Sequence, residues 1–183
     1  FKQEFDSLYA SLFKSPRCHI AIITELTKKK HGLVREDLLK ASKLSDNADF
    51  SKALQELEQC GFIRKFTAIG KKTKDESFQL IDNYTLFYFD FISENTNGDE
   101  HFWSSSAGSS IHYGWAGRAF ERVCMQHINQ IKAALGFSAV VSSVHSWSYK
   151  GTKDPATGKT LTKGEQIDML IDRNDDTINR CEM

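Results

Sequence analysis

The sequence lacks the features that mark disulfide-stabilised, fibrous or membrane-spanning proteins. It has two prolines in 183 residues, and no apolar run approaches the roughly 18 residues that a membrane-spanning helix needs. The four cysteines are far apart and form no CxxC pair, which argues against a disulfide scaffold or a zinc site. They are Cys18, Cys60, Cys124 and Cys181. With no secretory signal visible, the composition predicts a cytoplasmic protein without a membrane partner.

An excess of charge of either sign is also absent. The formal net charge is zero, so the whole chain has no overall electrostatic attraction to nucleic acid. A hydrophobic content of 40% and a charged content of 26% are typical of a soluble globular protein with one domain or two small ones. The chain begins at Phe1, without a methionine, and ends inside an apolar strand pattern. We therefore expect it to be a fragment of a longer protein.

Residues 1–82 show helical periodicity followed by two strand-like runs. Helices are expected over 1–13, 17–30, 34–44 and 48–60, and strands over 62–69 and 77–81, with Ser15-Pro16 as the first break. Three short helices before a β-hairpin are the order of a winged helix-turn-helix domain, which we assign to residues 17–82. Residues 1–16 are expected to form a helix from a preceding region. The predicted apolar faces contain Phe1, Phe5, Leu8, Leu12, Ile20, Ile23, Leu26, Thr27, Leu38, Leu39, Leu44, Phe50, Ala53, Leu54 and Leu57.

The charges of this half leave two functions open. In a winged helix the helix over 48–60 would enter the DNA major groove. Its outer face carries three acidic residues and one lysine, which phosphates would repel: Asp49, Lys52, Glu56 and Glu58, with Gln55 between them. The hairpin is more basic, and we assign a nucleic-acid contact to Arg64, Lys65, Lys71, Lys72 and Lys74. The alternative is that these cations are solvated surface and the domain binds a protein partner.

Residues 83–114 read as an aromatic helix and a linker. Tyr84, Phe87, Tyr88, Phe91 and Ile92 fit helical spacing, so we expect them to pack the first domain against the next. A base-stacking platform is the alternative, and the scarcity of interleaved cations weighs against it. The stretch 101–112, rich in Ser and Gly, is expected to be a surface connection.

The final region, 115–183, predicts a long helix, a strand and a hairpin. The helix over 115–135 has an apolar stripe that includes Phe120, Val123, His127 and Leu135, with Glu121 at its margin. Strands are expected over 137–147, 165–172 and 177–183. The loop contains Thr157-Gly158-Lys159-Thr160, but Lys153 occupies the position of the first P-loop glycine and no helix follows. The sequence therefore excludes nucleotide binding at this loop.

Two carboxylates lie on the last two predicted strands. Asp168 stands inside an apolar run, where a carboxylate is costly unless it is paired or holds a metal. If the two runs form a hairpin centred on residues 174–175, the sequence positions of two residues that face each other add up to about 349. Glu182 would then lie near Ile167 and Asp168. Oxygen ligands of this kind favour hard divalent cations. A structural alternative is that Asp168 bonds a backbone amide and Glu121 and Glu182 are surface residues.

These carboxylates resemble a known pattern. Glu121 on a helix, Asp168 in Gln-Ile-Asp and Glu182 in Cys-Glu-Met resemble the PD-(D/E)XK nuclease superfamily. More broadly, the runs Phe5-Asp-Ser-Leu-Tyr-Ala-Ser-Leu-Phe13, Asp82-Asn-Tyr-Thr-Leu-Phe-Tyr-Phe, Gly117-Arg-Ala-Phe-Glu121 and Gly164-Glu-Gln-Ile-Asp168 are similar to the C-terminal region of a family of bacterial and archaeal AAA-type ATPases. That family combines a P-loop ATPase domain, a winged helix and a nuclease-like domain.

The resemblance implies an α+β protein: a winged helix-turn-helix followed by a partial α/β restriction-endonuclease-like core. It implies that Glu121, Asp168 and Glu182 are catalytic, metal-binding residues for Mg²⁺. ATP would bind only in a preceding domain, and the lysine of the motif would fall at position 184. We therefore expect a nucleic-acid-binding and nucleic-acid-processing module that is inactive as a nuclease in this fragment. The alternatives are a non-catalytic protein-interaction or regulatory module of the ATPase, and a transcription regulator.

Overall fold

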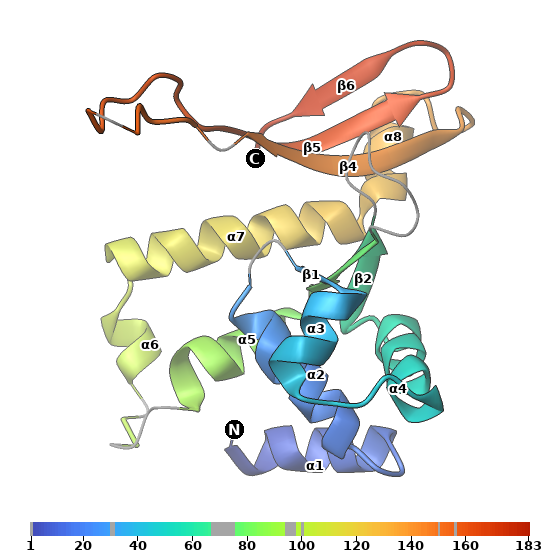
Figure 1. The fold of residues 1–183 in the computed structure, drawn as a ribbon, viewed down its shortest axis with the longest axis vertical. Helices are drawn as coiled ribbons and strands as arrows, with labels where there is room; N and C mark the ends of the chain where they lie inside the picture. Colours follow the sequence, from blue (N-terminus) through green and yellow to red (C-terminus); the bar gives the residue numbers. More distant parts are fainter. Residues whose placement is uncertain are drawn as a thin grey trace. The chain divides into compact units, whose positions relative to one another are not determined.

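The computed structural model describes residues 2–29, 32–66, 76–93, 98–99, 101–149, 151–155 and 157–183. The protein is of the mixed α+β class and has two small antiparallel sheets (Figure 1). It divides into two compact units. Unit 1 is Phe1–Thr67 with Lys72–Ala107, and unit 2 is Ala68–Lys71 with Gly108–Met183. In the described part of the chain, no helix combines the length and the apolarity required for a membrane crossing.

Unit 1 contains four helices and a small sheet before its aromatic segment. In chain order these are α1 (Lys2–Leu12), α2 (Arg17–Thr27), β1 (Leu33–Val34), α3 (Arg35–Ser42), α4 (Ala48–Gln59), β2 (Ile63–Phe66) and β3 (Ser77–Leu80). The sheet order is β1-β3-β2, and both pairings are antiparallel. The expected helices and the hairpin strands are present, while the two-residue strand β1 was not predicted from the sequence.

Helix α4 follows directly from its sequence. The side chain of Asn47 accepts a hydrogen bond from the Phe50 amide at 2.9 Å, which satisfies one free donor of the first turn. The four apolar residues predicted to face the core are all buried: Phe50, Ala53, Leu54 and Leu57. After the helix, Gly61 takes a φ of +76°, a conformation that glycine adopts at low cost.

The buried face of α1 differs from the predicted one. Phe5, Tyr9 and Phe13 are buried, whereas Leu12 is 48% exposed. Phe5 and the partly buried Leu8 reach the core as predicted, whereas the prediction for Leu12 is wrong, because Tyr9 and Phe13 continue the inward stripe from Phe5. The Phe5 ring stacks on Tyr88, with ring centroids 3.9 Å apart. Phe1 lies outside the described residues.

The aromatic segment is helical, as predicted. It forms α5 (Asn83–Phe87) and a π-helical turn, η2 (Tyr88–Ile92). The Asp82 side chain caps α5 by accepting from the Thr85 amide at 2.7 Å. The stretch 101–112 is not a plain connection, because α6 (Phe102–Ser105) lies in it and α7 begins at Ser110. Its Ser and Gly content had indicated a loop.

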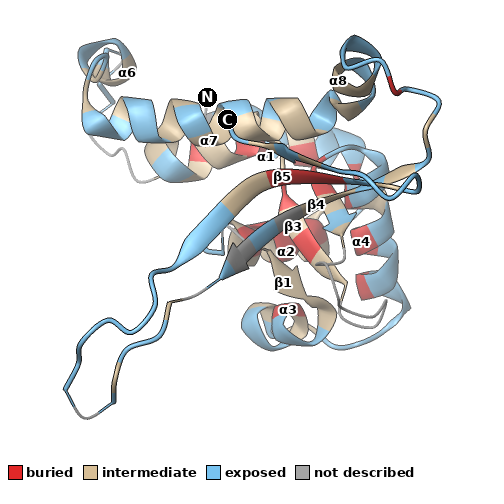
Figure 2. Cartoon of the chain, turned by 90° about the horizontal axis from the view of Figure 1, so that it is seen from above, coloured by how far each residue is buried: buried red, intermediate tan, exposed pale blue. Residues whose placement is uncertain are grey.

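Unit 2 is a broken helix followed by a three-stranded meander. Its elements are α7 (Ser110–Gln126), α8 (Ile128–Ala134), β4 (Ser142–Tyr149), β5 (Glu165–Arg173) and β6 (Ile178–Cys181), and the antiparallel sheet has the order β4-β5-β6. Buried residues of β5 form its core together with Phe137, as the colouring of β5 in Figure 2 shows. Met125, Ile128, Ile131 and Val144 pack against this core.

The single helix predicted over 115–135 is wrong in one respect. The backbone leaves helical geometry at His127 (φ −104°, ψ 28°), which separates α7 from α8. His127 is exposed, and its Nδ1 donates to the Val123 carbonyl at 2.8 Å, so it is not the core histidine that the stripe predicted. Phe120 is also 56% exposed. Because of the break, the residues of α8 are rotated relative to those of α7, and only part of the predicted stripe reaches the core.

Candidate functional site

The pairing of β5 with β6 brings the two predicted strand carboxylates into register. Met169 lies opposite Cys181, and Leu170 lies opposite Arg180, so opposite residues sum to 350, one more than expected. Continuing this register by one step sets Glu182 opposite Asp168. Opposite residues of an antiparallel pair point to the same face of the sheet. We call Asp168 and Glu182 the carboxylate pair.

Each member of the carboxylate pair already has a hydrogen-bond donor. The Met183 amide donates to Asp168 Oδ2 at 3.0 Å, and the Gln166 side-chain amide donates to Asp168 Oδ1 at 3.3 Å. Arg180 Nε donates to Glu182 Oε1 at 2.7 Å. Asp168 is half-buried and Glu182 is exposed. These donors offset the negative charge and hold both carboxylates in defined positions.

The pairing of Arg180 with Glu182 was not predicted from the sequence. A signal existed, because residues two apart on a strand share a face and these two have opposite charge. Burial raises the pKa of the neighbouring Cys181 thiol, and Cys124 and Glu182 raise it further. Cys181 is therefore a neutral, partly buried thiol beside the carboxylate pair.

Glu121 does not join the carboxylate pair. It lies in α7, one helical turn before Met125, which packs on the Met169 and Ile171 face of the sheet. Alternation along β5 turns Asp168 to the opposite face from Met169. Across the described residues, no three His, Cys, Asp or Glu side chains form a group that could hold a metal ion. Continued by one position, the β5–β6 register places two of the three predicted ligands, Asp168 and Glu182, opposite each other.

The described cations of the predicted wing are engaged within the protein. Arg64 Nε donates to Gln79 Oε1 at 2.7 Å, and its guanidinium lies 4.9 Å from the centroid of the Phe66 ring. Burial lowers the pKa of Arg64 to about 10. Lys65 forms an ion pair with Glu76 at 3.4 Å. The other residues of that prediction, Lys71, Lys72 and Lys74, lie outside the described residues.

The outer face of α4 is acidic. Glu56 accepts a hydrogen bond from Nε2 of the buried His19 at 2.9 Å, and Lys52 lies 3.7 Å from its other oxygen. Asp49 and Glu58 are exposed on the same helix. A helix with this charge does not favour insertion between the phosphates of a DNA groove.

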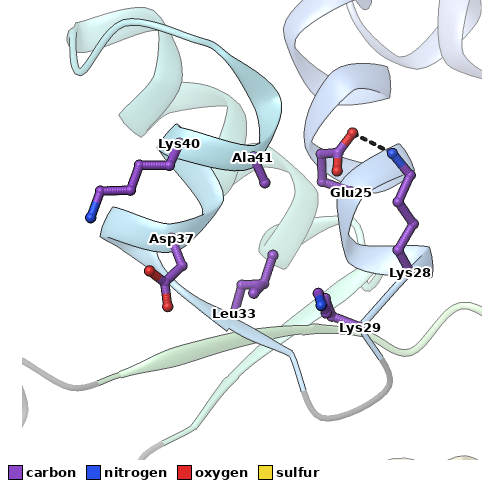
Figure 3. A pocket seen from close by; sticks show the side chains of 7 residues that line it. All are labelled: Glu25, Lys28, Lys29, Leu33, Asp37, Lys40 and Ala41. Carbon is purple, nitrogen blue, oxygen red and sulfur yellow. Dashed lines mark hydrogen bonds and ion pairs between the residues drawn. The ribbon is translucent and has the colours of Figure 1, made fainter.

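A groove lies between the end of α2, β1 and α3 (Figure 3). It measures about 460 Å³ and is lined by Glu25, Lys28, Lys29, Leu33, Asp37, Lys40 and Ala41. Two of its lysines are in ion pairs, Lys28 with Glu25 at 2.7 Å and Lys40 with Glu36 at 2.8 Å. Because charges of both signs alternate around it, the groove does not select a ligand of one charge.

The fold defines a mixed α+β protein whose candidate site is the carboxylate pair on β5 and β6. Comparisons of the chain with protein-family models, with curated proteins and with solved structures found no match. The function of the protein is therefore inferred from its residues and their geometry.

Proposed function

We propose that the protein binds and processes nucleic acid, with unit 1 as a winged helix-turn-helix and unit 2 as part of a PD-(D/E)XK nuclease-like core. The element order α2, β1, α3, α4, β2, β3 and the sheet order β1-β3-β2 support the first assignment. A helix before an antiparallel meander, with Asp168 on the middle strand, supports the second. The resemblance to AAA-type ATPases extends the proposal to an ATP-hydrolysing parent protein whose nucleotide binds in another domain.

One observation carries the proposal: the β5–β6 register, which sets Asp168 and Glu182 opposite each other when it is continued by one position beyond the Met169–Cys181 pair. In proteins Mg²⁺ is usually held by one or two carboxylates, with water and substrate phosphates as its other ligands, so this donor set fits the ion. When bound, Mg²⁺ would polarise a phosphate oxygen and lower the pKa of a coordinated water. The chain's own residues orient the carboxylates, through the Met183 amide and Gln166 on one side and Arg180 on the other.

Replacement of the carboxylate pair is expected to weaken Mn²⁺ binding, with Mn²⁺ as a probe for Mg²⁺. Asp168→Asn and Glu182→Gln each remove a charged oxygen ligand, so each should lower the affinity about 10-fold or more, as losses at metal ligands and their supports do. Water-proton relaxation in Mn²⁺ titrations of the full chain measures this without any nucleic acid.

The matched control is Asp172→Asn. Asp172 lies on the same face of β5, four residues from Asp168, and its neighbour on β6 is Ile178, which is not a carboxylate. It should leave Mn²⁺ affinity unchanged. If Asp172→Asn and Asp168→Asn lower the Mn²⁺ affinity equally, the affinity depends only on the overall charge of the strand, and the proposed site is wrong.

A second candidate function, a non-catalytic module that binds a protein partner, is favoured by the acidic face of α4. The two candidates differ in what α4 contacts. If α4 enters a DNA groove, the double variant Asp49→Asn with Glu58→Gln removes repulsion and should raise DNA affinity about 10-fold, with a steeper salt dependence. If α4 faces a protein, we expect unchanged DNA affinity. Fluorescence anisotropy with a labelled duplex separates the two.

A further inference from the structure

The segment that joins β4 to β5 is an ordered extension of the sheet. Residues 151–164 are called the basic arm. Its described residues, 151–155 and 157–164, continue past the ends of the two strands, and nearly all of them are exposed (Figure 2). Tyr149 pairs with Glu165 at the base of the arm, where the regular ladder ends. The arm contains the Thr157-Gly158-Lys159-Thr160 run, which the sequence excluded as a nucleotide-binding loop.

Hydrogen bonds across the arm hold its two sides together. The Leu161 amide donates to the Thr152 carbonyl at 2.9 Å, and the Asp154 amide donates to the Lys159 carbonyl at 2.8 Å. The Thr162 hydroxyl lies 3.0 Å from the Tyr149 hydroxyl and 2.9 Å from that of Thr152. The arm is therefore a short two-stranded ribbon, paired at one isolated bridge between Lys153 and Thr160 and through the hydrogen bonds around it.

The close approach of the two sides also depends on a glycine. A Cβ at Gly151 would lie 2.4 Å from the Thr162 carbonyl oxygen and 2.6 Å from the Gly164 nitrogen. Both neighbours are backbone atoms, which cannot move aside as a flexible side chain can. The narrow base of the arm therefore requires a glycine at position 151.

The arm concentrates positive charge in a neutral protein. Residues 151–164 contain three lysines and one aspartate, a net charge of +2, while the chain as a whole has a formal charge of zero. Lys153, Lys159 and Lys163 are exposed, and within the described residues none of them has an ion-pair partner. The carboxylate of Asp154 accepts from the Thr157 amide at 3.3 Å, so the one acidic residue serves the turn.

We propose that the basic arm is a nucleic-acid-binding element whose lysines contact the phosphate backbone. Lysine side chains and threonine hydroxyls are ordinary phosphate ligands, and the arm also carries Thr152, Thr157, Thr160 and Thr162. A two-stranded ribbon has the width that the DNA major groove admits. The remainder of the chain carries a net −2, so the arm differs in charge from the rest of the protein.

Protein partners and membrane surfaces fit the arm less well than nucleic acid does. Protein interfaces depend on buried Trp, Tyr and Arg anchors, and residues 151–164 contain none of these. Membrane-surface binding requires a large apolar face, and Leu161 is the one large apolar residue of the arm. The inference deepens the proposed function by assigning a contact for the nucleic acid, and it does not depend on the carboxylate pair.

Anisotropy of labelled single-stranded and duplex DNA, in EDTA and over a range of salt, tests the arm separately from the metal site. The triple variant Lys153→Ala, Lys159→Ala and Lys163→Ala should weaken binding about 10-fold or more at low salt and reduce the slope of log affinity against log salt by about 3, one for each lysine. The matched control replaces Lys14, Lys29 and Lys43, which are also exposed and lie outside α4, and should change neither quantity.

A second variant replaces residues 150–164 by Asn-Gly, a two-residue turn suited to the Tyr149–Glu165 pair. It should bind DNA as weakly as the triple variant while Mn²⁺ binding at the carboxylate pair is retained. The inference is overturned if the wild-type chain does not bind DNA, if the control triple loses as much affinity, or if anionic vesicles bind and DNA does not. Loss of Mn²⁺ binding alone would count against the proposed function and not against the arm.

Discussion

Replacing Tyr9 with alanine is expected to lower the free energy of unfolding by about 5 kcal/mol. Removing a buried aromatic ring costs about 3–5 kcal/mol, and leaving a buried hydroxyl without a partner adds about 1–3 kcal/mol. Tyr9 is 0% exposed, its ring centroid lies 4.7 Å from that of Phe5, and its hydroxyl lies 2.9 Å from the Thr85 hydroxyl. Urea denaturation of the full chain, followed by circular dichroism, measures the loss.

Tyr9→Phe separates the ring from the hydroxyl. It keeps the aromatic packing and leaves Thr85 without its partner, so the loss should be about 1–3 kcal/mol. Equal losses in the alanine and phenylalanine variants would show that ring burial contributes nothing. The importance of this contact lies in its span, since it joins α1 to α5 across 76 positions of the sequence.

The same variant gives a pH signature. Burial raises the pKa of Tyr9 above its ordinary value of 10.0, because the fold disfavours the ionised phenolate. This contribution to stability is complete below about pH 10 and is lost as the pH rises towards the folded-state pKa. Wild-type stability should therefore fall more steeply above pH 10 than that of Tyr9→Phe. Parallel curves would contradict the role of Tyr9, since Tyr84 and Tyr88, whose pKa values burial also raises, are common to both proteins.

Replacing Gly32 with alanine is the second large effect, with an expected loss of about 3 kcal/mol or more. Gly32 has a φ of +77°, which costs an L-residue about 1–2 kcal/mol. A Cβ there would also lie 2.4 Å from the Phe78 carbonyl oxygen on β3. Overpacking of this kind adds about 1–3 kcal/mol. The chain would have to move β1 away from β3, and thermal or urea unfolding would report the loss.

Gly61→Ala is the matched control for this substitution. Gly61 has nearly the same φ, +76°, but a Cβ there meets nothing within 4 Å. Only the conformational cost of about 1–2 kcal/mol is expected. If the two alanine variants lose the same stability, then the approach of Gly32 to Phe78 does not constrain the sheet.

Local patterns in the sequence were sufficient to predict the elements whose signals agree with each other. For α4, the apolar spacing, a capping residue at Asp46 or Asn47 and the terminal glycine all indicate one helix, and the structure has it with Asn47 as the cap. Around His127 the sequence pattern and the structure disagree, because apolar residues continue at helical spacing although the backbone leaves helical geometry. Strand β1 was missed because two residues are too few for a periodic pattern, and its existence depends on β3, which lies more than forty residues later.

The candidate site shows the same division. Alternation along β5 and a hairpin turn were enough to predict the β5–β6 register to within one position, and this register, continued by one step, sets Asp168 opposite Glu182. The position of Glu121 could not be predicted in this way, because it depends on how α7 packs on the sheet. Helical spacing identifies a face, but the direction in which that face points is decided by tertiary contacts of residues such as Met125.

The alternation along β5 links the interior of unit 2 to its surface chemistry. Met169 and Ile171 are buried, with 1% and 0% of their surface exposed. Asp168 and Gln166 lie on the opposite face of the strand. A slip by a single position would carry the carboxylate into the core and an apolar side chain into water. The position of the two surface carboxylates is therefore maintained by buried side chains that no ligand touches, and a conservative change in the core can alter the site without changing any of its residues.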